Sequence, residues 1–418
     1  MKKYIYIIIF LISSLCYSQK VLIPMDNIQK DHLKAYGIAF HSLQKSNNIE
    51  WLLNYRGGSF LLNDYSELQK ICTIRGVSFE LIDSQKLSEI LMIIEENNMD
   101  IVLLEKEPKI AVYSPPDKQP WDDAVTLALT YAEIDYDVIF DEEVLTGKLS
   151  KYDWLHLHHE DFTGQYGKFY KNYSRTSWYK QMENDFQTLA NKFGFESVPK
   201  LKKTIALKIK EYISNGGFLF AMCSATDSFD IALATQNIDI AASVYDGDPV
   251  DKNYQDKINF SNSIAFENYE LYTNPMIYEY STIDLPPSHM PDAQGAEEDY
   301  FTLFDFSAKW DQVPTMLTQN HVAVINGYMG QTTGFNKDYI KDYILILGED
   351  ATNNLAKYIH GNVGKGTFTF LGGHDPEDYK HYVGDPPTDL SLHRNSPGYR
   401  LILNNVLFPA AKKKKRKT

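Results

Sequence analysis

The stretch from residue 215 to residue 230 constrains the fold of this chain more than any other, because it indicates a helix end, a buried strand, a tight bend and a new helix in direct succession. Gly216 and Gly217 end the first helix, since glycine readily takes the left-handed conformation there. Residues 218–222 are apolar on both faces, as in a parallel strand covered by helices. Ser224, Thr226 and Asp227 are candidate caps of the second helix. The stretch therefore predicts an α/β protein.

Cys223 lies at the predicted bend between the strand and the helix. Small neighbours, Ala221 and Ala225, allow the chain to turn tightly there, as a nucleophile elbow requires. A helix N-terminus favours a thiolate, and the backbone N–H of Ser224 is a candidate oxyanion donor. The alternative is that Cys223 is a small buried apolar residue with no chemical role. Both interpretations stay open at this point.

The segment after residue 106 predicts a doubly wound, mostly parallel sheet of the flavodoxin-like kind. Strands are expected at 109–113, 136–140, 152–160 (running into a loop) and 218–222, and residues 361–371 are expected to form a turn and a further strand. Ligands of such sheets bind beyond the carboxyl ends of the strands. The predicted pocket rim at that edge contains His158, His159, Glu160 and Asp227, together with Cys223.

The predicted organisation has four parts. Residues 1–18 form a signal peptide, 19–106 a smaller N-terminal α/β domain, 107–411 the large α/β domain and 412–418 a basic tail. Two lysines precede the short apolar run 4–12, and the expected cleavage lies before Gln19. A lipid anchor on Cys16 is the less favoured alternative. This pattern predicts a secreted or periplasmic protein whose mature chain has no transmembrane span, because no other run approaches about 20 apolar residues.

The charge of the chain argues against nucleic acid as a partner, and its cysteine content argues against stabilisation by a disulfide framework. The formal net charge is −14, so nucleic acid is not an expected partner, because binding phosphates requires a basic surface. The tail at 412–417 is interpreted as a solvated end. The mature chain would keep Cys72 and Cys223, which does not indicate a disulfide framework.

His374 and Glu377 follow the last predicted strand and complete a candidate catalytic set. Cys223 would attack an acyl carbon, His374 would accept the thiol proton and Glu377 would orient the imidazole. The sequence thus predicts an amide hydrolase or acyl transferase for a small molecule, peptide or sugar derivative. It predicts no cofactor and leaves the oligomeric state open.

The elbow, the sheet order and the pattern V-G-K-G…F-L-G-G-H at 363–374 resemble the class I glutamine amidotransferase-like superfamily, especially its ThuA-like branch, over residues 109–408. The resemblance implies Cys223 as nucleophile and His374 with Glu377 as its partners. Here alanines replace the usual flanking glycines, and two residues separate the histidine from the glutamate. The chain also resembles secreted Bacteroidetes proteins labelled asparagine synthetase B, although it has no S-G-G-x-D-S loop.

The sequence is compatible with two alternative functions beside the thiol chemistry. The dense cluster His156-x-His158-His159-Glu160 offers imidazole and carboxylate ligands that suit zinc in a metal-dependent hydrolase. On a regular strand His156 and His158 point one way and His159 the other, so convergence requires a bend. The second alternative is a binding module for sugars or peptides. It is supported by the aromatic residues Tyr166, Phe169, Tyr170, Tyr173, Trp178 and Tyr179.

Overall fold

The computed structural model describes residues 19–116, 122–284, 300–318, 322–326, 330–377 and 384–411. The predicted signal peptide and the basic tail lie outside the described residues. No helix in these ranges is long and apolar enough to cross a membrane.

The N-terminal part forms a five-stranded antiparallel sheet of order β4-β1-β3-β2-β5. Its elements are β1 (Lys20–Ile23), α1 (His32–Gln44), β2 (Ile49–Leu53), η1 (Tyr55–Gly57), β3 (Ser59–Asn63), α2 (Leu68–Arg75), β4 (Glu80–Ile82), α3 (Ser84–Glu96) and β5 (Asp100–Leu104). Alternate residues of the strands pack against α1 on one face and against α3 on the other. The α/β character predicted for this part is therefore confirmed.

A second, ten-stranded sheet holds the predicted bend. Its parallel half, in spatial order β7-β6-β8-β9-β15, consists of β7 (Asp137–Ile139), β6 (Ile110–Tyr113), β8 (Trp154–Leu157), β9 (Phe218–Met222) and β15 (Gly366–Leu371). The other half is antiparallel: β14 (Leu355–Val363), β13 (Leu345–Asp350), β10 (Tyr300–Leu303), β11 (Val324–Asn326) and the short β12 (Phe335–Asn336). The sheet is thus mixed, where the sequence predicted a mostly parallel one.

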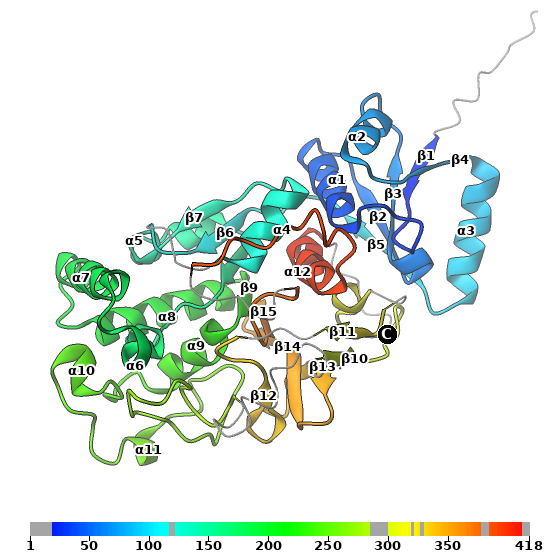
Figure 1. Ribbon diagram of the computed structural model, residues 1–418. Helices are drawn as coiled ribbons and strands as arrows, with labels where there is room; N and C mark the ends of the chain where they lie inside the picture. The colour runs from blue at the N-terminus through cyan, green and yellow to red at the C-terminus, as the bar shows by residue number, and fades with distance from the viewer. Residues whose placement is uncertain are drawn as a thin grey trace, which may run out of the picture.

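Helices cover both faces of the parallel half (Figure 1). α4 (Ala124–Ala132) and α12 (Pro397–Leu407) share one apolar core with the strands, whereas α5 (Asp141–Leu145), α8 (Val198–Ser214) and α9 (Ser224–Ala234) share a second core on the opposite face. The all-apolar composition of β9 follows from this double burial, since all five of its residues are buried.

The remaining segments are the helix α7 (Ser177–Lys192) and several short helical turns. The turns comprise η2 (Lys148–Lys151), η3 (Tyr166–Lys168), α6 (Tyr170–Tyr173), α10 (Ser243–Asp246), α11 (Tyr254–Lys257), η5 (Pro314–Leu317), η6 (Lys337–Tyr339) and η7 (Phe408–Ala410). Residues 170–192 are thus largely helical, whereas residues 238–240 are irregular.

Candidate functional site

Cys223 occupies a strained bend between β9 and α9. Its backbone has φ 50° and ψ −141°, a conformation that residues with a side chain rarely adopt. The Cys223 amide donates to the carbonyl of Leu371 at the end of the neighbouring strand β15 (3.3 Å). The bend therefore joins the carboxyl ends of two adjacent parallel strands, and it directs the thiol toward that edge of the sheet.

The thiol of Cys223 is buried, with 2% of the residue exposed. Burial raises its pKa to about 11, although backbone N–H groups of Thr332, Ser224 and Gln331 contact the sulfur and act in the opposite direction. Cys223 is consequently a protonated thiol at neutral pH.

A short loop, residues 330–333, lies directly over this thiol. A Cβ added to Gly330 would be 3.0 Å from Sγ of Cys223 and 3.0 Å from the backbone nitrogen of His374. The loop is attached to α9, because the Thr332 hydroxyl donates to Oδ1 of Asp227 (2.9 Å). It is attached to the end of β15 by a bond from the Gly373 amide to the Thr332 carbonyl (2.7 Å).

The prediction that Ser224, Thr226 or Asp227 caps α9 is wrong, because Cys223 is the N-cap, no side chain among the described residues makes a capping hydrogen bond there, and the three residues lie within the helix. Ser224 and Asp227 instead support the bend. The Ser224 hydroxyl donates to the carbonyl of His159 (3.1 Å), which links α9 to the segment after β8. Asp227 is fully buried, and burial raises the pKa of its carboxyl to about 7. Both residues therefore position the chain around Cys223.

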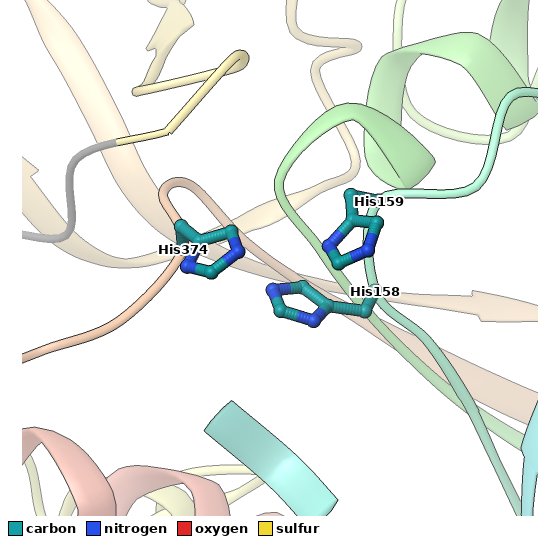
Figure 2. Close-up of side chains that lie close together, drawn as sticks. All are labelled: His158, His159 and His374. Atoms are coloured by element: carbon teal, nitrogen blue, oxygen red, sulfur yellow. The ribbon is translucent and has the colours of Figure 1, made fainter. Parts of the chain in front are cut away.

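Three histidines converge beside this bend (Figure 2). His158 and His159 follow β8, and His374 follows β15. The ring centre of His374 lies 4.4 Å from that of His158 and 5.4 Å from that of His159, onto which it stacks. One ring nitrogen from each histidine lies within 4.8 Å of the others. The chain bends at His159, and this bend removes the obstacle that strand alternation poses to their convergence.

Asp123, at the N-cap of α4, is the acidic partner of this region. Its Oδ2 lies 3.2 Å from Nε2 of His156 and 3.2 Å from Nδ1 of His158. Burial alone would raise the pKa of Asp123, but the two imidazoles hold it well below its usual value. For His159, burial and the neighbouring imidazoles lower the pKa, so its ring is neutral.

Within the described residues, neither Glu160 nor Glu377 belongs to the cluster of ligand atoms that the three rings form. Glu160 borders a cavity of about 20 Å³, enough for about one water molecule, and burial raises its pKa to about 8. The carboxylate of Glu377 lies 3.2 Å from Nδ1 of His393. The role of Glu377 in orienting His374 stays a prediction.

The structure adds residues that the sequence did not single out for the site. These are Asp123, which precedes α4 as its N-cap, and the loop 330–333, which lies in a region without clear periodicity. Some of the aromatic residues proposed for stacking on ligands also contact one another: the ring centres of Tyr173 and Trp178 are 5.2 Å apart, and those of Phe169 and Trp178 are 5.8 Å apart.

Comparisons with known proteins identify no family. No protein-family model and no curated protein matches the chain. Among solved structures it is similar to the cytoplasmic protein STM3548 from Salmonella typhimurium, at 12% identity and a TM-score of 0.36, covering 73% of this chain and 100% of that one. It is also similar to a beta-galactosidase from Bacillus circulans sp. alkalophilus, at 13% identity and a TM-score of 0.28, covering 66% of this chain and 30% of that one. Likenesses at TM-scores this low establish neither a shared fold nor a shared activity.

Proposed function

We propose that this protein is a secreted or periplasmic cysteine-dependent hydrolase or acyl transferase that acts on an amide or ester of a small molecule, peptide or sugar derivative. The observation that carries the proposal is the strained bend at Cys223, with backbone N–H groups gathered around its sulfur. Strained backbone of this kind persists only where the surrounding structure enforces it, and it is concentrated at functional sites.

The strand order supports a flavodoxin-like, class I amidotransferase-like assignment for the large domain. In chain order the parallel strands β6, β7, β8, β9 and β15 take the spatial order 2-1-3-4-5. This is one of the two common orders of doubly wound sheets, whose ligands bind at the carboxyl edge where the order reverses. Cys223 and His374 follow neighbouring strands at that edge.

The proposed reaction forms a thioester on Cys223. Sγ attacks the carbonyl carbon while the thiol proton passes to the imidazole of His374. The developing oxyanion accepts a hydrogen bond from the Ser224 amide, and collapse of the tetrahedral adduct expels the amine or alcohol, which takes the proton from His374. Water or an acceptor then cleaves the thioester. Because burial keeps the resting thiol protonated, this transfer to the imidazole must accompany attack.

Trapping of the acyl group tests this function. Incubation with p-nitrophenyl acetate at pH 7.5 should place one acetyl group on Cys223, detected by peptide mass spectrometry. Acetylation should disappear in Cys223→Ala and fall by about 100-fold or more in His374→Gln, in line with the usual contribution of a general base.

Cys72→Ala is the matched control, because Cys72 is also a buried free thiol but lies in α2, far from the site in the fold. Its acetylation should equal that of the wild type. Equal acetylation of folded Cys223→Ala, or labelling spread over surface lysines, would rule out Cys223 as the nucleophile.

A further inference from the structure

We infer that His158, His159 and His374 form a binding site for one divalent transition-metal ion, with zinc as the reference ion. This site goes beyond the proposed thiol chemistry, in which His374 acts as a base. An imidazole whose lone pair holds a metal ion cannot accept a proton, so the base role of His374 belongs to the chain without the ion. It also differs from the cluster at residues 156–160 that the sequence suggests, because one ligand, His374, comes from a segment that is distant in the sequence.

The spacing of the three imidazoles suits a single ion. Two nitrogens bound to a tetrahedral zinc at about 2.1 Å lie about 3.4 Å apart. The ring nitrogens of this set lie within 4.8 Å of one another. Small side-chain rotations that move each nitrogen by up to about 1 Å therefore bring them to that spacing. Figure 2 shows the rings of His158 and His159 on one side and that of His374 facing them.

His158 already presents a nitrogen in the form that a metal ion needs. Only 2% of the residue is exposed, and Nδ1 lies 3.2 Å from Oδ2 of Asp123, although the contact lacks the alignment of a good hydrogen bond. An N–H at Nδ1 leaves the lone pair on Nε2. Within the described part of the chain Nε2 is buried and has no hydrogen-bond partner. A bound ion would satisfy it, and Asp123 would play the orienting role of the carboxylate in carboxylate–histidine–metal sets.

His156 cannot serve as a ligand in the same way. Its Nδ1 lies 3.1 Å from the carbonyl of Phe220, and its Nε2 lies 3.2 Å from Oδ2 of Asp123. Both ring nitrogens therefore already have hydrogen-bond partners, so neither is available to an ion unless one of these contacts is broken. Asp123, His156 and His158 also lie close enough together to be considered as metal ligands. We interpret Asp123 and His156 as support for the histidine triad and not as a competing metal site.

The position of the triad suits an accessible ion. His159 and His374 are half-buried while His158 is fully buried. The ion would therefore be accessible to solvent on the side of His159 and His374. The triad lies at the carboxyl end of β8, beside the reversal of strand order between β6 and β8, where doubly wound sheets bind their ligands. Three histidines leave one tetrahedral position for solvent or substrate, as in catalytic zinc sites.

Zinc binding to the purified chain tests the inference. After dialysis against EDTA, zinc titrated in competition with a chromophoric chelator should bind at one equivalent per chain. His158→Gln, His159→Gln and His374→Gln should each weaken binding by about 100-fold or more, and Asp123→Asn by about 10–100-fold. Cobalt in place of zinc should give the intense visible absorption of a four-coordinate ion.

His41→Gln is the control, because His41 lies on α1 and its ring contacts only Gln44 among the hydrogen-bond partners described (3.3 Å). Its zinc affinity should equal that of the wild type. Wild-type-like affinity in folded His374→Gln would overturn the site, and so would a His156→Gln loss as large as that of His159→Gln. Acetylation of Cys223 and zinc binding are measured separately, so the failure of one proposal can be told apart from the failure of the other.

Discussion

At the scale of single residues, the backbone of Cys223 is the most informative feature. Its φ of 50° with ψ of −141° costs a residue with a side chain about 1–3 kcal/mol. Neighbouring hydrogen bonds hold it in place, because its amide donates to Leu371 while its carbonyl accepts from the Thr226 amide (3.1 Å) and hydroxyl (2.7 Å). The surrounding fold therefore imposes the bend on the residue.

Because of this strain, we expect glycine to stabilise the folded protein more than alanine at position 223, the reverse of the usual order. Cys223→Gly should be more stable than Cys223→Ala by about 1 kcal/mol, because glycine adopts positive φ without a steric penalty. Urea denaturation of both variants measures the difference.

Ala221→Gly in the middle of β9 is the comparison, and there glycine should destabilise by about 0.5–1 kcal/mol. A Cys223→Gly variant less stable than Cys223→Ala would show that the bend stores no strain.

At the scale of elements, the loop 330–333 depends on helix α9. The Thr332 hydroxyl and the Ser228 amide both donate to Oδ1 of Asp227, each at 2.9 Å. Oδ2 of Asp227 is buried and has no hydrogen-bond partner among the described residues. A neutral carboxyl suits this environment better than a carboxylate, which explains why the pKa of Asp227 rises to about 7.

A pH-dependent stability contribution follows from Asp227. Because its folded pKa lies above its ordinary value of 3.8, the folded protein binds the extra proton, and wild-type stability falls as pH rises from about 4 to about 7. Asp227→Asn removes this dependence. The stability of the variant relative to the wild type should increase by about 2–3 kcal/mol between pH 5 and pH 8, at about 1.4 kcal/mol per pKa unit.

Urea denaturation at the two pH values gives this difference. The exposed Asp256→Asn serves as the control and should show no such change. A pH-independent difference for Asp227→Asn would contradict a protonated Asp227 in the folded protein.

At the scale of the whole molecule, the two sheets are joined through helices and are not independent bodies. α1 packs against α4 and α12, and Gly37 approaches α4 so closely that a Cβ there would lie 1.8 Å from the carbonyl oxygen of Ala132. The fully buried guanidinium of Arg400, on α12, donates to the carbonyls of Gly57 (2.6 Å) and Met25 (3.2 Å) in the N-terminal part. One apolar core continues through this contact.

We therefore expect the N-terminal and large domains to unfold together. Calorimetry should give one transition whose calorimetric and van't Hoff enthalpies agree. Arg400→Met should lower the Tm of that transition, because it leaves buried carbonyls without their donor, at a cost of about 1–3 kcal/mol for each. Two resolved transitions in the wild type would contradict this coupling.

The sequence by itself determined the local features whose signals lie in neighbouring residues. The all-apolar run 218–222, flanked by Gly216–Gly217 and by the polar residues that open α9, predicted a buried strand followed by a tight bend. The α/β class followed from runs of this kind. Hydrophobic periodicity is a local property, so these elements could be recognised before their partners were known.

Only the tertiary structure decided which residues meet. His374 is more than two hundred residues from His158, yet β9 pairs with both β8 and β15 and so brings their carboxyl ends to one edge. The antiparallel half of the large sheet and the loop over Cys223 come from residues 300–363, whose short strands carry little periodic signal. The imidazole cluster and the burial of the thiol depend on strand pairing between distant segments, and no pattern of adjacent residues encodes that pairing.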